Sequence, residues 1–125
     1  MTEQIAHLYA TAQLAIAFFQ VALIAGAPLG RYTQGGAQEG VLPLKGRVIA
    51  ALSIPVVILQ GLAILSAAGF PGLNWPLWTG WAAAAVTGVS LILNLITPSQ
   101  AERALWAPVL SVLLAMALYV MVVGP

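Results

Sequence analysis

Residues 47–69 read RVIAALSIPVVILQGLAILSAAG, and this stretch decides what kind of fold the chain adopts. After its first residue it carries no charge. An apolar segment of about 20 residues is long enough to cross the hydrocarbon core of a bilayer as an α-helix. We therefore predict a transmembrane helix over about these residues.

The rest of the chain has the same character, with three further apolar stretches at about residues 4–26, 76–96 and 105–124. Of the 125 residues, 62% are hydrophobic and 6% are charged, whereas a soluble domain carries about 25% charged residues. A chain this short cannot hide so much apolar surface from water. We predict an all-α polytopic membrane protein in which four helices form one up-down bundle domain over residues 1–125. The N-terminal stretch lacks the positive start of a secretory signal peptide, so we expect it to be a retained helix.

All Lys and Arg residues fall in or beside two of the three connections between these helices. Arg31, Lys45 and Arg47 flank the first connection, and Arg103 lies in the third. The positive-inside rule therefore predicts that the first and third loops are cytoplasmic and that both termini face outward. Tryptophans favour membrane interfaces, and four lie near predicted helix ends: Trp75, Trp78, Trp81 and Trp106.

Polar side chains recur at matching depths in the predicted helices. Those about six residues from the inner helix ends are Gln20, Ser53, Ser90 and Ser111. Gln13 and Gln60 lie deeper, and Thr87 shares a helix face with Ser90. These side chains either hold the bundle together by interhelical hydrogen bonds or line a path for a small polar solute. Pro55 removes a backbone hydrogen bond and could widen the inner half of the bundle.

Gly80, Ala84 and Gly88 are spaced by four along the third predicted helix. Such a small-residue stripe lets the backbone of a neighbouring helix come close. We therefore predict a helix-packing stripe at these three positions.

The stretch NLITPSQAER at residues 94–103 leads out of the third helix. In the simplest interpretation it is a plain exit from the membrane, because Pro98 disfavours helix before it. The alternative is a cytoplasmic-face site in which Arg31 of the first loop pairs with Glu102. The members of that candidate site are Arg31, Tyr32, Asn94, Glu102 and Arg103.

The sequence lacks the residues that most membrane enzymes and pumps need. No Asp, Glu, Lys or Arg lies near the middle of a predicted helix, which counts against proton- or ion-coupled transport. Cysteine is absent, and the single histidine, His7, is expected at the outer interface. We expect no enzyme, no catalytic residue and no cofactor or metal site, because such sites usually need several ligands. A net charge of +1 is too small to predict binding of nucleic acid, which needs a cluster of positive charge.

Two stretches, GAPLGRYTQGG at residues 26–36 and NLITPSQAERALWAP at residues 94–108, resemble a group of small bacterial four-span proteins with no assigned role. The resemblance implies four spans and residence in the bacterial inner (plasma) membrane. It implies no reaction.

Two function hypotheses follow from the sequence. The first is a non-enzymatic membrane protein that works by association with itself or with another membrane protein, supported by the small-residue stripe. The second is a small homo-oligomeric channel or facilitator for a small polar solute. A dry interior with an exposed Gly80–Gly88 stripe would favour association. A wet, continuous lining would favour the facilitator, and its members would be Gln13, Gln20, Gln60, Thr87 and Asn94.

Overall fold

The computed structural model describes all residues, 1–125, as an all-α chain without strands. Its long helices are α1 (Thr2–Ile24), α2 (Leu44–Ala67), α3 (Leu77–Ile96) and α4 (Gln100–Val123). Each is long and apolar enough to cross a membrane. The predicted four-helix membrane fold is therefore confirmed.

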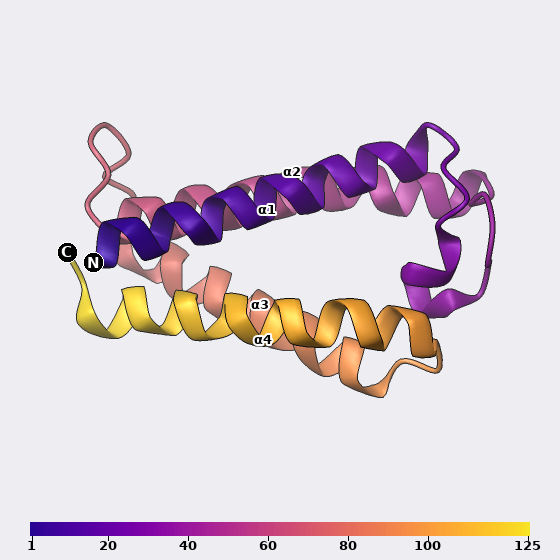
Figure 1. Ribbon diagram of the computed structural model, residues 1–125. Helices are drawn as coiled ribbons and strands as arrows, with labels where there is room; N and C mark the ends of the chain where they lie inside the picture. Colours follow the sequence, from indigo (N-terminus) through magenta and orange to yellow (C-terminus); the bar gives the residue numbers. More distant parts are fainter.

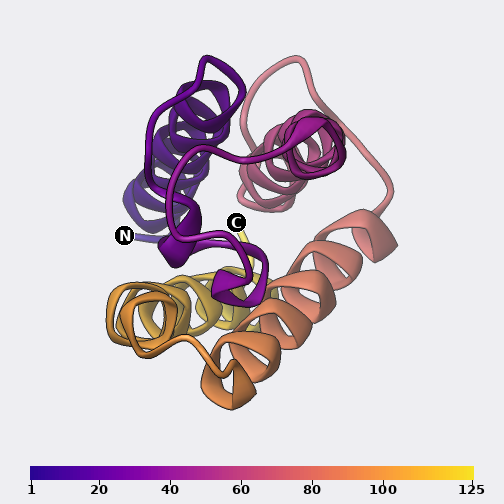
Figure 2. The same cartoon turned by 90° about the vertical axis from the view of Figure 1, so that its right-hand side faces the viewer.

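The helices run up and down, so the molecule has two distinct ends (Figure 1). One end, here called the termini end, holds both chain termini and the turn between α2 and α3. The other, the loop end, holds the connection between α1 and α2 and the link between α3 and α4. The longer connection contains two short 3-10 turns, η1 (Gly30–Tyr32) and η2 (Gln34–Gly36). It crosses over the end of the bundle, as the view along the helices shows (Figure 2).

Small residues let the helices approach closely. On α2, a Cβ added to Gly61 would lie 3.4 Å from the Ala10 Cα of α1. On α3, a Cβ added to Gly80 would lie 2.4 Å from the Met121 sulfur of α4. Because contact between apolar surfaces alone associates helices weakly in lipid, such close packing stabilises the two helix pairs.

The helices α2 and α3 meet near the termini end and separate toward the loop end (Figure 2). Near the termini end, an added Cβ at Gly80 would lie 3.3 Å from the Ala67 Cβ. The apolar core is also concentrated in this half, where Ala6, Tyr9 and Ile64 have no exposed surface. Toward the loop end the two helices leave room for a cavity.

The start of α4 differs from the prediction. The helix begins at Gln100, not near residue 105. Ser99 is its N-cap, and the Ser99 hydroxyl accepts a hydrogen bond of 3.1 Å from the Glu102 backbone N–H. Such a cap satisfies a backbone donor that would otherwise lack a partner. Glu102 and Arg103 therefore lie in the first turn of α4 and not in a loop.

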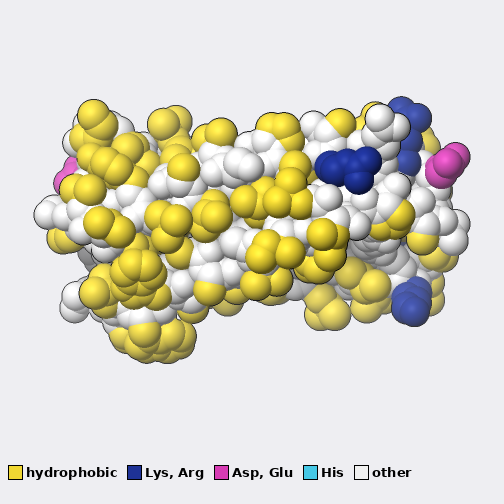
Figure 3. Space-filling view, turned by 90° about the horizontal axis from the view of Figure 1, so that it is seen from below, with side chains coloured by type: hydrophobic (Ala, Val, Ile, Leu, Met, Phe, Trp, Pro, Cys, Tyr) yellow, Lys and Arg dark blue, Asp and Glu magenta, His cyan; other side chains and the backbone are white.

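Charged and apolar side chains are separated along the molecule. Apolar side chains cover most of the length of the visible face, and Lys and Arg side chains lie toward the loop end (Figure 3). Exposed leucine, valine and isoleucine on all four helices fit a lipid-facing surface.

Candidate functional site

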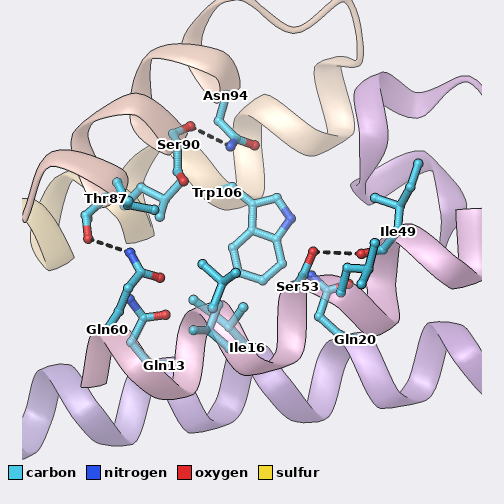
Figure 4. A pocket seen from close by; sticks show the side chains of 15 residues that line it. Gln13, Ile16, Gln20, Ile49, Ser53, Gln60, Thr87, Ser90, Asn94 and Trp106 are labelled. Atoms are coloured by element: carbon cyan, nitrogen blue, oxygen red, sulfur yellow. Dashed lines mark hydrogen bonds between the residues drawn. The ribbon is translucent and has the colours of Figure 1, made fainter. Parts of the chain in front are cut away.

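A cavity of about 380 Å³ lies between α2 and α3 in the loop-end half of the bundle, with α1 and α4 behind it (Figure 4). This volume falls in the range of small-molecule sites in proteins, about 300 to 1,000 Å³. Polar side chains from three helices line it: Gln13, Gln20, Ser53, Gln60, Thr87, Ser90 and Asn94. The two depth levels seen in the sequence thus belong to one cavity.

The deep end of the cavity is closed by a buried hydrogen-bond network. The Thr87 hydroxyl donates to the Ala83 carbonyl over 2.8 Å, so it accepts from the Tyr9 hydroxyl, 2.7 Å away. The Gln13 amide donates to the Tyr9 oxygen over 3.0 Å. The Gln60 amide donates to the Thr87 oxygen over 3.3 Å and to the Ala83 carbonyl over 3.4 Å. This network ties α1, α2 and α3 together.

The network uses one amide N–H of Gln13 and both of Gln60, and it leaves the two side-chain carbonyl oxygens free. Each amide N–H₂ of Gln13 and Gln60 is directed at a hydroxyl or a backbone carbonyl. Their carbonyl oxygens take no part in these bonds and face the cavity (Figure 4). The deep end therefore presents hydrogen-bond acceptors to whatever fills it.

Trp106 closes the side of the cavity where α1 faces α4. Its indole lines the cavity and meets the Phe19 ring edge-on, with centroids 5.1 Å apart. The indole N–H donates to the Tyr32 carbonyl of the covering loop over 2.7 Å. Trp106 thus connects the cavity wall to the loop that crosses the bundle end.

The rim of the cavity is apolar and exposed. Ile49, Leu52 and Val56 on α2 and Val86 on α3 have between 40% and 66% of their surface accessible. In contrast, Gln13, Gln60 and Thr87 at its floor are buried. The cavity is therefore a polar floor behind an apolar rim, on the side of the bundle where α2 and α3 separate.

Asn94 lies at the loop end of the cavity. Its amide donates to the Ser90 carbonyl of its own helix over 2.8 Å. Its side-chain oxygen is the one buried side-chain polar atom without a hydrogen-bond partner. An unsatisfied buried acceptor costs about 1 to 3 kcal/mol, so a ligand donor within its reach would be stabilising.

Two predicted members of the polar layer behave differently from the rest. Ser111 is exposed on α4, away from the cavity, and donates to the Ala107 carbonyl over 2.7 Å. Its assignment to the layer is therefore wrong, because matching depth does not fix the direction in which a side chain points around its helix. Ser53 does line the cavity, but its hydroxyl donates to the Ile49 carbonyl of its own helix and joins no other helix.

The predicted cytoplasmic-face residues do not form one cluster. The Arg31 guanidinium lies 4.9 Å from the centre of the Tyr32 ring and donates to its hydroxyl. Arg103 donates to the Thr97 carbonyl over 3.1 Å. Asn94 belongs to the cavity. The expected ion pair between Arg31 and Glu102 is therefore not formed.

Glu102 instead fastens the first loop onto the start of α4. It is 8% exposed, accepts a hydrogen bond from the Thr97 hydroxyl, and accepts another of 3.4 Å from the Gly35 backbone N–H. Nearby, the Ser99 hydroxyl donates to the Arg31 carbonyl over 2.6 Å. Together with the Trp106 contact, these bonds join residues 26–36 to residues 94–108. We call this set of contacts the loop clamp.

The small-residue stripe lies inside the bundle. Gly80 and Ala84 are buried, and Gly80 faces Met121 of α4. Gly88 lies farther from α4, since an added Cβ would be 3.8 Å from the Leu114 Cδ1. The stripe serves packing between α3 and α4 of the same chain.

Sequence reasoning missed Tyr9 and Trp106 as members of the site. Tyr9 lies four residues before Gln13, so it shares a face of α1 with that glutamine, and this spacing was an available signal. From the sequence, Trp106 is expected only at the membrane interface. Its place on the cavity wall depends on the direction in which it points from α4.

No protein-family model matches the chain, and neither a curated protein nor a solved structure matches it. The function is therefore inferred from the geometry of the cavity. That geometry supplies hydrogen-bond acceptors, a few hydroxyl groups and an aromatic wall, and it supplies no ionisable group.

Proposed function

We propose that the protein is a small, non-enzymatic integral membrane protein that binds a lipid-phase molecule in the cavity between α2 and α3. The observation that carries this proposal is the buried polar floor behind an exposed apolar rim. A molecule dissolved in the bilayer reaches such a floor from the side. Few convergent polar groups in a mainly apolar pocket are typical of small-molecule sites.

The association hypothesis loses the observation that suggested it. An association role, with a second copy or another membrane protein, would need the small-residue stripe on the surface. Gly80 and Ala84 are buried inside the bundle instead, and Gly80 faces Met121 of α4. The lipid bilayer itself remains the partner that the exposed apolar surface supports.

A facilitator for a small polar solute is the second candidate. It is favoured by one observation, since the five side chains named for its lining all line the cavity: Gln13, Gln20, Gln60, Thr87 and Asn94. Against it stands the closed termini-end half, where Tyr9 and Ile64 have no exposed surface. Such a facilitator would need this half to open.

The proposed setting is a bacterial inner membrane with the loop end in the cytoplasm. The Lys and Arg residues gather toward that end (Figure 3), and basic residues favour the cytoplasmic side. The loop clamp joins the two stretches that carry the bacterial resemblance, which supports treating them as one unit.

The proposal is tested by native mass spectrometry of the full chain, extracted with its lipids retained. We expect wild-type protein to carry a bound lipid-phase molecule as a mass adduct. Ser90→Leu should weaken or remove the adduct, because the larger apolar side chain takes up part of the cavity and replaces one of its hydroxyl groups. Ser111→Leu is the matched control, since it makes the same change at a lipid-exposed serine.

An adduct that persists undiminished in Ser90→Leu as well as in Ser111→Leu would place the molecule elsewhere and overturn the proposal. A wild-type spectrum without any adduct would do the same. In that second case, liposome flux assays of small solutes would test the facilitator, and a co-purifying protein would restore the association hypothesis.

A further inference from the structure

Building on the proposed function, we infer that the cavity takes an uncharged amphiphile with a hydroxyl or amide N–H head and one apolar chain. The head lies in the polar cavity, and the apolar chain of the amphiphile lies in an apolar trough that continues from it between α2 and α3. A long-chain alcohol is the simplest member of this class.

The requirement for a donor follows from the hydrogen bonds of the deep network. At the deep end, one amide N–H of Gln13, both of Gln60 and the Thr87 hydroxyl proton are used. The free donors of the Gln20 amide and the Ser90 hydroxyl lie nearer the loop end of the cavity, so the requirement concerns its deep end. The Trp106 N–H is used by the Tyr32 carbonyl. The carbonyl oxygens of Gln13 and Gln60, which these bonds leave free, can only accept. A head that only accepts would leave them unsatisfied.

The requirement for an uncharged head follows from the lining. None of the fifteen lining residues is Asp, Glu, Lys, Arg or His. Moving a charge into a low-dielectric site without a counter-charge is costly. A carboxylate or phosphate would also face the acceptor oxygens of Gln13 and Gln60. The cavity therefore disfavours anionic lipid heads.

The apolar chain of the amphiphile would lie in a second cavity of about 310 Å³ toward the termini end. This second cavity shares Val56, Gln60 and Val86 with the polar cavity, so the two are continuous. Its walls are almost entirely apolar and include Trp75 and Trp78. A molecule with a polar head and an apolar chain matches this arrangement of a polar cavity followed by an apolar one.

The test compares three probes of equal chain length on the full protein after removal of its lipids. The probes are dodecanol, dodecyl methyl ether and dodecanoate, and native mass spectrometry gives the apparent Kd of each. The ether retains the acceptor oxygen but lacks the donor. We expect dodecanol to bind about tenfold more tightly than the ether, the factor given by about 1.4 kcal/mol from one hydrogen bond.

Gln60→Met locates the effect, because methionine keeps the length of the side chain and removes its carbonyl. It should lower the ratio of the two Kd values, because only the Gln13 oxygen then remains at the deep end, and Ser111→Ala should leave the ratio unchanged. An unchanged ratio in Gln60→Met would overturn the donor requirement. Gln13→Met is the second variant, used if Gln60→Met does not fold.

Equal binding of ether and alcohol, with both weakened or lost in Ser90→Leu, would overturn the donor requirement while the proposed function stands. Tighter binding of dodecanoate would overturn the uncharged head. Absence of binding by all three probes overturns this inference. The proposed function would then fall as well only if the natural mass adduct were also absent.

Discussion

Tyr9 joins α1 to α3 through a single hydroxyl. That hydroxyl accepts from Gln13 and bonds Thr87, and the side chain has no exposed surface. Tyr9→Phe removes the oxygen and leaves the Gln13 amide without its acceptor. We expect a loss of about 1 to 2 kcal/mol in the free energy of unfolding, measured by titrating the protein in mixed micelles with sodium dodecyl sulfate.

Tyr119→Phe is the control for this change, because Tyr119 is an exposed tyrosine of α4 that does not belong to the network. It should shift stability by less than about 0.5 kcal/mol. If both variants unfold at the same detergent fraction as wild type, the network does not stabilise the bundle.

At the scale of single residues, the sequence predicts the depth of a side chain along its helix well. It predicts the direction of that side chain around the helix axis poorly. Gln13 and Gln60 were placed at the same level, and both reach the deep network. Ser111 was placed at the level of Ser90, yet it points away from the cavity. Counting along a helix gives the height of a residue. The direction around the helix axis depends on which neighbours the helix packs against, and one sequence does not contain that information.

The close packing of α3 against α4 depends on the absence of a side chain at Gly80. A Cβ there would lie 2.4 Å from the Met121 sulfur and 3.3 Å from the Ala67 Cβ. A flexible methionine can move aside for alanine, but not for a leucine side chain between two helices. We expect Gly80→Leu to destabilise the protein by about 1 to 3 kcal/mol through overpacking, in the same detergent titration.

Gly88→Leu provides the comparison within the same stripe. Its nearest neighbour is the Leu114 Cδ1, 3.8 Å from an added Cβ, so the cost should be clearly smaller. If Gly80→Leu and Gly88→Leu lowered the free energy of unfolding equally, Gly80 would not be the point of close packing between α3 and α4.

The loop clamp depends on Gly36. Its φ is +70°, and an added Cβ would lie 2.5 Å from the Ser99 Cβ. Gly36→Ala should therefore release residues 26–36 from α4 and raise amide hydrogen exchange at Gly35, whose N–H bonds Glu102. Gly40→Ala, at a position with open space around it, should leave this exchange rate unchanged. Unchanged exchange in Gly36→Ala would argue against the clamp.

The start of α4 is marked in the sequence by a capping pattern, which an analysis of hydropathy alone does not detect. Ser99 followed three residues later by Glu102 fits the start of a helix. Two adjacent charges suggested a loop outside the membrane instead. The helix begins in this polar stretch because a cap and two loop contacts satisfy its charged first turn. Apolar length alone therefore underestimates helices that extend beyond the bilayer.

For the whole molecule, four apolar stretches were enough to predict the number of helices and the bundle. They did not predict where the bundle opens. The cavity exists because α2 and α3 meet near the start of α3 and separate toward its end (Figure 2). This separation is a property of the packed helices and not of either helix alone. It brings the polar residues into one site that no single segment reveals.

The orientation of the whole molecule can be tested directly, because the chain has no cysteine. Ala37→Cys places a thiol on the exposed loop that carries the clamp, and Pro71→Cys places one in the exposed turn at the termini end. If the basic loop end lies in the cytoplasm, a membrane-impermeant maleimide should label only Pro71→Cys in intact cells. Permeabilised cells should show labelling of both, which controls for reactivity. The reverse pattern would place the basic loops outside, and the mouth of the cavity would then lie nearer the outer leaflet.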